Sequence, residues 1–160
     1  MKRTKQVFSV ENLQKIKEQI LYWINQFNVC SFLDNHQYHS EHHSVECIAA
    51  AGEISSITGA DTAKAIDVFY ETNQDWLFGH FGYDYHANQL NDLQKRNPIN
   101  FSDAFFFRPD HILSLNNHSL VIESYSLQPK AIFDEITAVK PTLEKSSPIK
   151  TTPSISKDIY

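Results

Sequence analysis

Four histidines lie close together in the first third of the chain, and their spacing raises the question of a metal site. The four imidazoles and the carboxylates near them are His36, His39, His42, His43, Asp34, Glu41 and Glu46. Zinc accepts histidine nitrogen and carboxylate oxygen, and a spacing of three or more residues lets two rings converge. The segment 34–44 has no helical or strand periodicity, however, so the chain would not hold these ligands in place in advance. We therefore favour a solvated polar loop, with a ligand-facing loop and a zinc site as the alternatives.

A second group of chemically capable residues lies in the stretch 75–84, which reads DWLFGHFGYD. In an extended strand its terminal carboxylates, Asp75 and Asp84, would be about 30 Å apart at ~3.3 Å per residue. This separation is too large for the paired carboxylates of a glycosidase. We expect Asp84 to cap a following helix instead.

Other catalytic patterns are weak or missing. A Ser–His–Asp triad is compatible with the composition, but there is no Gly-x-Ser-x-Gly elbow to present the nucleophile. The chain has only 4 glycines and no phosphate-binding loop, which argues against a nucleotide site built on a glycine-rich turn. We therefore assign no catalytic residue, no metal ligand and no cofactor to this chain.

Two of the glycines, Gly79 and Gly82, lie inside the apolar stretch 75–84. Glycine weakens a strand, and in that position it marks a bulge or a close approach by another backbone. We expect a bulge that serves aromatic packing. A neighbouring element or domain pressing on the strand is a compatible alternative.

Length and composition favour one globular domain. The 160 residues are 41% hydrophobic and carry a net charge of −5. The negative charge argues against nucleic acid as a general partner, and the basic start (Lys2, Arg3 and Lys5) is expected to be a solvated tail. No apolar run is long enough to span a membrane, and no signal peptide is recognisable. With Cys30 and Cys47 expected as free, half-buried thiols in strands, we predict a cytoplasmic protein.

The apolar patterns predict alternating helices and strands. Helices are expected at 10–28, 61–73, 85–95 and 130–139, and strands at 29–33, 45–51, 75–83, 104–107, 112–115 and 120–125. We expect Ser9 and Asp61 to cap the first two helices, Asn28 to end the first helix, and Gly52 to close the second strand. A turn is expected at 116–118, where two asparagines favour a hairpin.

This order of elements predicts an α+β fold, with a mixed or antiparallel sheet and flanking helices. Residues 1–140 are expected to form the domain. Residues 141–160 begin with PTLEKSSPIKTTPSIS, a stretch rich in proline, serine and threonine, which is typical of a linker.

Several segments, in their order, resemble the amino-terminal domain of component I of aminodeoxychorismate synthase, the para-aminobenzoate branch of folate synthesis. They are CSFLDNH (30–36), HSVECIAAAG (43–52), DWLFGHFGYD (75–84), FFFRPDHIL (105–113) and VIESY (121–125). The likeness covers roughly residues 5–140 and is shared with anthranilate synthase component I.

The resemblance implies a domain without catalytic residues of its own. In this family a larger carboxy-terminal domain binds chorismate and Mg²⁺, and a glutamine amidotransferase subunit supplies ammonia. The final residues 156–160 look like the start of that catalytic domain. The implied partners are therefore the catalytic domain, the amidotransferase subunit and, through an uncovered sheet, a second copy of this chain.

The resemblance also implies an amino-terminal tryptophan pocket, whose family pattern is Leu-Leu-Glu-Ser followed by Arg-Tyr/Phe-Ser. In this sequence Leu33, Asp34 and Asn35 fall at the first motif and Ser44 falls at the second. The Glu and Arg positions do not match, which leaves the charged groups of an amino acid poorly satisfied. We therefore expect a vestigial pocket, which favours the para-aminobenzoate branch over the anthranilate branch.

Three alternatives stay open from the sequence. The chain could be a stand-alone module that binds an aromatic amino acid, a fragment of anthranilate synthase component I, or a small metalloprotein that uses the histidine loop. Calorimetry with tryptophan separates the first of these from a non-binding domain, and metal analysis tests the last.

Overall fold

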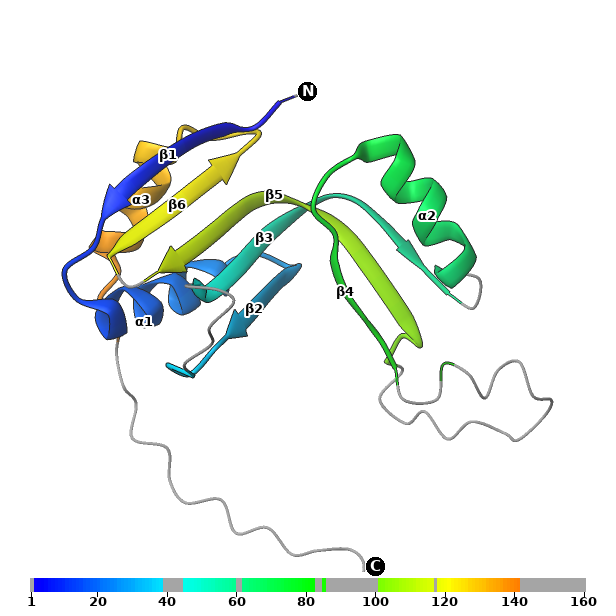
Figure 1. Cartoon of the computed structure of the whole chain (residues 1–160), viewed down its shortest axis with the longest axis horizontal. Helices are drawn as coiled ribbons and strands as arrows, with labels where there is room; N and C mark the ends of the chain where they lie inside the picture. The colour runs from blue at the N-terminus through cyan, green and yellow to red at the C-terminus, as the bar shows by residue number, and fades with distance from the viewer. Residues whose placement is uncertain are drawn as a thin grey trace, which may run out of the picture.

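The computed structural model describes residues 2–38, 45–59, 62–82, 85, 101–116 and 118–141. Within that part of the chain, six strands and three helices follow one another (Figure 1). They are β1 (Thr4–Ser9), α1 (Leu13–Ile24), β2 (Cys30–Asp34), β3 (Val45–Thr58), α2 (Thr62–Asn73), β4 (Phe78–Phe81), β5 (Ala104–Asn116), β6 (Ser119–Ser124) and α3 (Pro129–Ala138).

The strands form one antiparallel sheet in the order β1-β6-β5-β3-β2, with β4 paired to β5 off this path. This confirms the α+β class and the antiparallel form of the expected sheet. Because β3 and β5 are much longer than the other strands, the sheet has two parts (Figure 1). We call them the main half and the arm. The main half holds β1, β6 and β2 with the parts of β3 and β5 that end at the pair Glu53–Pro109. The arm holds β4 and α2 with the parts of β3 and β5 that begin at the pair Ser55–Arg108.

Helices α1 and α3 supply the core of the main half. Ile20 and Ile24 of α1 and Ile132 and Ile136 of α3 are at most 1% exposed, and they pack against alternate residues of β3, β5 and β6. The helical spacing of these apolar residues places them on one face, as the sequence indicated. The first helix is shorter than expected, and its cap is different from the expected Ser9. The Asn12 side chain accepts the Lys15 N–H at 2.9 Å.

The carboxy-terminal end of α1 also differs from the expectation. Asn25, rather than Asn28, is the residue that follows the last turn of α1. The second and fourth helices expected from the sequence correspond to α2 and α3, with bounds that differ by at most one residue. Asp61 and Asp84, the other expected caps, lie outside the described residues, as does all of the helix expected at 85–95 except Tyr85.

The arm begins where the β3–β5 pairing changes register. Between Glu53 and Ser55 one extra residue is inserted in β3, opposite Pro109 of β5. Proline has no N–H to give to the ladder, and in a central strand it is tolerated at such a bulge. The expected end of a strand at Gly52 is therefore wrong, because Gly52 continues β3 in a left-handed conformation (φ 73°). Likewise, the two strands expected at 104–107 and 112–115 are one strand.

The amino-terminal residues are not the solvated tail that their charge suggested. Residues 4–9 form β1, which pairs with β6 so that Thr4 faces Ser124 and Ser9 faces Ser119. Phe8 is the one buried side chain of β1, and its ring stacks on Phe133 of α3 with centroids 4.2 Å apart. A single buried position gives an edge strand almost no apolar signature, which is why sequence patterns miss it.

The prediction of a close backbone approach at Gly79 is confirmed. A Cβ atom added to Gly79 would lie 2.1 Å from the Phe105 carbonyl oxygen and 2.7 Å from the Phe106 Cα. The expected bulge is absent at this point, since the β4–β5 register is continuous from Phe78 to Phe81. The neighbouring element that presses on β4 is therefore its own partner strand. At Gly82 the fit is looser, with Asp103 O at 3.2 Å.

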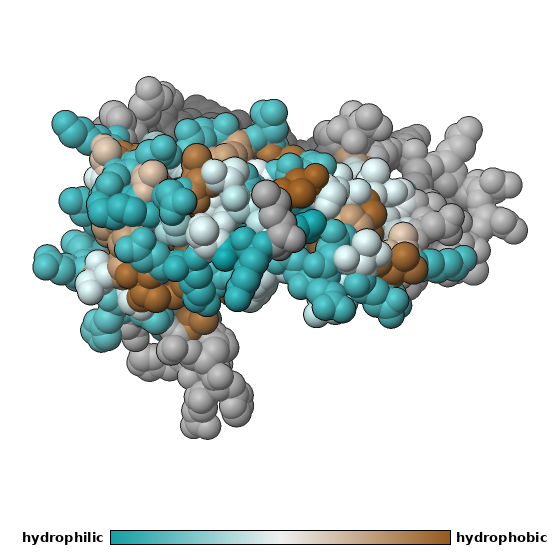
Figure 2. All heavy atoms as spheres, turned by 90° about the horizontal axis from the view of Figure 1, so that it is seen from above, coloured by the Kyte–Doolittle hydropathy of each residue, from teal (hydrophilic) through white to brown (hydrophobic). Residues whose placement is uncertain are grey.

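The surface mixes polar side chains with scattered apolar patches (Figure 2). Both cysteines lie in strands as expected, but Cys30 is exposed and Cys47 is buried. Among the described residues, none of the helices has the length and apolar content of a transmembrane span.

Candidate functional site

Three of the four expected pocket residues line one pocket. Leu33, Asp34 and Asn35, at the end of β2, border a cavity of about 380 Å³ together with residues 45–48 of β3. Ser44, the fourth, lies outside the described residues. The antiparallel pairing of Leu33 with Ile48 and of Asp34 with Cys47 brings the two strands together here. The walls are mostly apolar, which suits a small organic ligand better than an ion.

A buried charge triad stands beside this pocket. Lys17 of α1 donates to Asp34 Oδ1 at 2.6 Å and to Glu46 Oε1 at 2.7 Å. Burial alone would lower the pKa of Lys17, but these two bonds outweigh it and raise the pKa above its usual value. For Asp34, burial opposes ionisation, but the bonds from Lys17 and from the His36 backbone N–H hold its pKa below its usual value. Lys17 and Asp34 are therefore both ionised at neutral pH, and the triad places two carboxyl groups around one ammonium group.

The Cys47 thiol lies near the triad but has low reactivity at neutral pH. Burial raises the pKa of Cys47 to about 12. Because the thiolate is the reactive form, a thiol with this pKa is a poor nucleophile at neutral pH.

The histidine loop is described only in part. His36 is exposed, with Nδ1 at 3.6 Å from Asp34 Oδ2, and His39, His42 and His43 lie outside the described residues. Within the described ranges, no three side chains of metal-binding type converge. The zinc alternative therefore stays a prediction for those three histidines.

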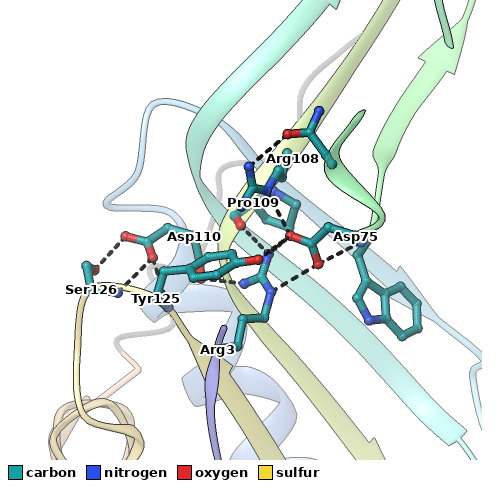
Figure 3. Close-up of polar contacts among 9 residues, drawn as sticks. Arg3, Asp75, Arg108, Pro109, Asp110, Tyr125 and Ser126 are labelled. Atoms are coloured by element: carbon teal, nitrogen blue, oxygen red, sulfur yellow. Dashed lines mark hydrogen bonds and ion pairs between the residues drawn. The ribbon is translucent and has the colours of Figure 1, made fainter. Parts of the chain in front are cut away.

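A second and larger polar cluster joins the two halves of the sheet, and sequence reasoning missed it. Its centre is Asp75, in the connection between α2 and β4 (Figure 3). Gln74 has a left-handed backbone conformation (φ 45°), which ends α2 and turns the chain so that Asp75 points inward. The Asp75 carboxylate is 9% exposed and receives two bonds from Arg3, at 3.2 and 2.8 Å.

Two further side chains bind the same carboxylate. Arg108 Nε, from the bend of β5, donates to Asp75 Oδ2 at 2.9 Å, and Tyr125 Oη, from the end of β6, donates at 3.0 Å. Burial alone would raise the pKa of Asp75, but the bonds from Arg3, from the Trp76 N–H and from Arg108 lower it to about 2. Asp75 is thus an anion at neutral pH, and its bonds join four segments that are distant in sequence.

Arg3 also satisfies the backbone at the bend. Its Nη2 donates to Pro109 O at 2.5 Å and its Nη1 donates to Asp110 O at 2.6 Å. Both guanidinium groups pack against the Tyr125 ring, with Cζ to centroid distances of 4.2 Å for Arg3 and 4.9 Å for Arg108. These are cation–π distances, and they align both arginines with the carboxylate (Figure 3).

A cleft of about 750 Å³ opens above this cluster. It is bordered by the start of β1, the end of β6 and the α2–β4 connection, with Lys2, Lys5, Tyr70, Trp76 and Glu123 among its lining residues. Its volume is within the range of small-molecule sites. The signal that could have indicated this site is the pair of isolated charges inside apolar segments, Asp75 and Arg108, since such residues need partners.

The described residues also contain a serine, a histidine and an aspartate in contact, but not as a catalytic triad. His111 Nδ1 lies 2.9 Å from Ser124 Oγ, and its Nε2 lies 3.7 Å from Asp110 Oδ2. Ser124 is 0% exposed and its Oγ already accepts the Leu127 N–H, so no substrate reaches it. Burial lowers the pKa of His111, so the imidazole is neutral at neutral pH, and it packs against both Trp23 and Phe27.

Comparisons with protein-family models, with curated proteins and with solved structures found no match for this chain.

Proposed function

We propose that this chain is a non-catalytic domain that serves a larger enzyme, and that the enzyme is a para-aminobenzoate synthase component I. The observation that supports a non-catalytic domain is that several side chains capable of chemistry are bonded to other residues or buried. In the described residues, Asp75 is neutralised by two arginines, Cys47 is a buried thiol, and His111 and Ser124 are enclosed in the core. The ordered sequence resemblance over roughly residues 5–140 supports the second half.

In this proposal the parent enzyme adds ammonia, released from glutamine by a partner subunit, to chorismate. Its catalytic domain holds chorismate and Mg²⁺, and the present domain supports it. The surface suited to that contact is the arm, where large apolar side chains are exposed: Trp76 is 47%, Phe81 48% and Phe101 55% exposed. Exposed aromatics of this kind are typical of an association surface, which a second copy of the chain could also occupy.

The first test is a turnover assay with the purified chain, chorismate, ammonia and Mg²⁺. We expect no consumption of chorismate and no aminodeoxychorismate by mass spectrometry, because Asp75 is held by two arginines and Cys47, His111 and Ser124 are buried. Product formation above the rate of a chain-free control would contradict the non-catalytic assignment.

The second test addresses the parent enzyme. Intact-mass measurement of the protein from its source cells should give a species much heavier than the 18.5 kDa of this sequence, carrying a chorismate-binding domain after Tyr160. An endogenous protein of 18.5 kDa that does not co-purify with a chorismate enzyme would reject it.

A second candidate function rests on the pocket at β2 and β3. Leu33, Asp34 and Asn35 line it, and the surplus carboxylate of the neighbouring triad would attract the ammonium group of an amino acid. A stand-alone binding module of this kind predicts a saturable calorimetric isotherm with tryptophan.

Leu33→Ser should weaken such an isotherm, because Leu33 lines the pocket and is 57% exposed. Leu127→Ser is the matched control, since Leu127 is 40% exposed and lies outside the lining residues. Heats indistinguishable from dilution with tryptophan, phenylalanine and tyrosine would reject this second candidate.

A further inference from the structure

The cleft above Asp75 carries a positive charge on a chain that is negative overall. Three basic side chains line it, Lys2, Arg3 and Lys5, against the carboxylates of Asp75 and Glu123, and Arg108 contacts Asp75 from the bend of β5. Asp110 lies on the far side of Tyr125, where its carboxylate accepts bonds from Ser126 (Figure 3). With a net charge of −5 for the whole sequence, this local surplus of positive charge is a distinct feature.

The basic side chains of the cleft make few of the stabilising contacts of the fold, except for Arg3. Lys5 is 59% exposed and pairs with Glu123 at 2.9 Å, an exposed ion pair that contributes little stability and can rearrange. Lys2 is exposed and takes part in none of the ion pairs within the described residues. Arg3 uses four of its five N–H donors, to Asp75, Pro109 and Asp110. Strand alternation places Arg3 and Lys5 on the face of β1 opposite Phe8, away from α3.

Aromatic side chains form the other wall. Tyr70, at the end of α2, is 55% exposed, and Trp76, just before β4, is 47% exposed. Trp76 rests on Phe78, with centroids 6.0 Å apart and planes 20° from parallel, so one face of the indole is supported. An exposed indole that is fixed from one side is a suitable platform on which a planar ring can stack.

We propose that this cleft binds a phosphate monoester that carries an aromatic ring, of which a nucleoside monophosphate is the representative. A phosphate monoester has a charge of about −1.5 to −2 at neutral pH and three acceptor oxygens. These oxygens meet Lys2 and Lys5, and the ring stacks at Trp76 and Tyr70. Arg3, whose side chain is 6% exposed, contributes its charge. The site uses side chains in place of a glycine-rich loop, and it is independent of any chorismate chemistry.

The test is a titration of the whole chain with AMP at low ionic strength, followed by calorimetry and by tryptophan fluorescence. Because Trp23 is 3% exposed and Trp76 is 47% exposed, quenching by a stacked base reports on Trp76. We expect saturable binding that weakens with added salt, since the contact is partly electrostatic. Ribose 5-phosphate, which lacks the base, should bind at least about tenfold more weakly, in the range expected for one stacked base.

Matched variants locate the site. Lys2→Ala combined with Lys5→Ala should weaken AMP binding about tenfold, equivalent to about 1.4 kcal/mol. Lys15→Ala combined with Lys130→Ala removes the same charge from α1 and α3 and should leave the affinity unchanged. Tyr70→Ala should weaken binding, while Tyr38→Ala, at an unrelated residue that is 74% exposed, should not.

Four results would overturn the proposal. They are a lack of AMP binding at millimolar concentration, an equal loss in the two double-lysine variants, equal affinities for AMP and ribose 5-phosphate, and tighter binding of a single-stranded oligonucleotide than of AMP. The last would assign the cleft to a nucleic acid strand instead of a free small molecule. None of these readouts depends on turnover of chorismate.

Discussion

In the main half of the sheet two helices bury their apolar faces, whereas in the arm one helix buries almost nothing. Helix α1 encloses Ile16, Ile20, Trp23 and Ile24, but of the α2 side chains only Thr62 is buried. A cavity of about 550 Å³ remains between α2 and β3, lined by residues that include Ile57, Ala65, Val68 and Phe69. The main half is therefore stabilised by close packing, while the arm depends on strand pairing, aromatic contacts and the Asp75 cluster.

The contrast in packing indicates that the main half provides most of the stability and that the arm provides the surfaces available for binding. Well-packed helices resist local opening, whereas regions with little buried apolar area open at low free-energy cost. The exposed aromatics and the positive cleft both belong to the arm or to its junction with the main half. We expect binding to involve the arm and folding to depend on the main half.

The largest expected effect is in the core under α1. Ile20→Ala should lower the free energy of unfolding by about 3–5 kcal/mol, because Ile20 is 0% exposed and its loss leaves a cavity. Chemical denaturation measures this. Leu21→Ala, one residue further along and 48% exposed, is the control and should change stability by less than about 0.5 kcal/mol. Similar losses in both variants would contradict the assignment of the core.

The next effect concerns β4. Gly79→Ala should destabilise the arm by about 2–3 kcal/mol, since a Cβ at 2.1 Å from the Phe105 carbonyl forces the two strands apart. Hydrogen exchange of the β4 amides should accelerate while the amides of α1 stay protected. Gly82→Ala, where the nearest atom is at 3.2 Å, should have a smaller effect. Uniform acceleration throughout the molecule would show that the arm and the main half open together.

Acid should weaken the junction between the two halves. The pKa of Asp75 is lowered from 3.8 to about 2 on folding, so this carboxylate stabilises the fold fully above about pH 4. The contribution is lost as the pH falls through the folded-state value, and it amounts to about 2 kcal/mol.

Denaturation measured from neutral pH to about pH 2 tests this expectation for Asp75. Asp75→Asn should lack this part of the pH dependence. Asp134→Asn, at a carboxylate that is 59% exposed on α3, should retain it. Identical pH profiles for the wild type and Asp75→Asn would contradict the role of the cluster.

The smallest effect is expected at Val68 of α2, an exposed side chain that borders the open cavity between α2 and β3. Val68→Ala should change the free energy of unfolding by less than about 0.5 kcal/mol, because Val68 is 64% exposed. Thermal unfolding followed by circular dichroism measures it. A loss comparable to that of Ile20→Ala would mean that α2 is covered in solution, as a second copy of the chain would do.

Sequence patterns were sufficient where one face of an element is apolar. Helices α1 and α3 and strand β6 follow from the periodicity of their apolar residues. Strand β2 was expected as a short buried strand, and it is a strand without a buried residue. The close approach at Gly79 followed from the cost of glycine in a strand. The antiparallel order of the strands could not be read in this way, because pairing joins residues far apart in sequence.

The candidate sites show the same limit. Leu33, Asp34 and Asn35 were selected through a resemblance and do line one pocket, but the Lys17 side chain that bonds Asp34 comes from a different element. The Arg3–Asp75 pair joins residues 72 positions apart, and Arg3 had the appearance of a solvated basic residue. When the fold brings charged residues together from distant segments, their spacing in the sequence follows no recognisable pattern.

The single extra residue at the start of the arm gives β3 one residue of chain length that its pairing with β5 does not use. Ile54 is 44% exposed and lies between the pairs Glu53–Pro109 and Ser55–Arg108. These two pairs involve consecutive residues of β5, so deleting Ile54 would leave Glu53 and Ser55 with their present partners in a regular ladder. Ile57 would keep its place at the cavity under α2. The start of the arm can therefore lose one residue without exchanging the two faces of β3, which a one-residue shift of the whole register would do.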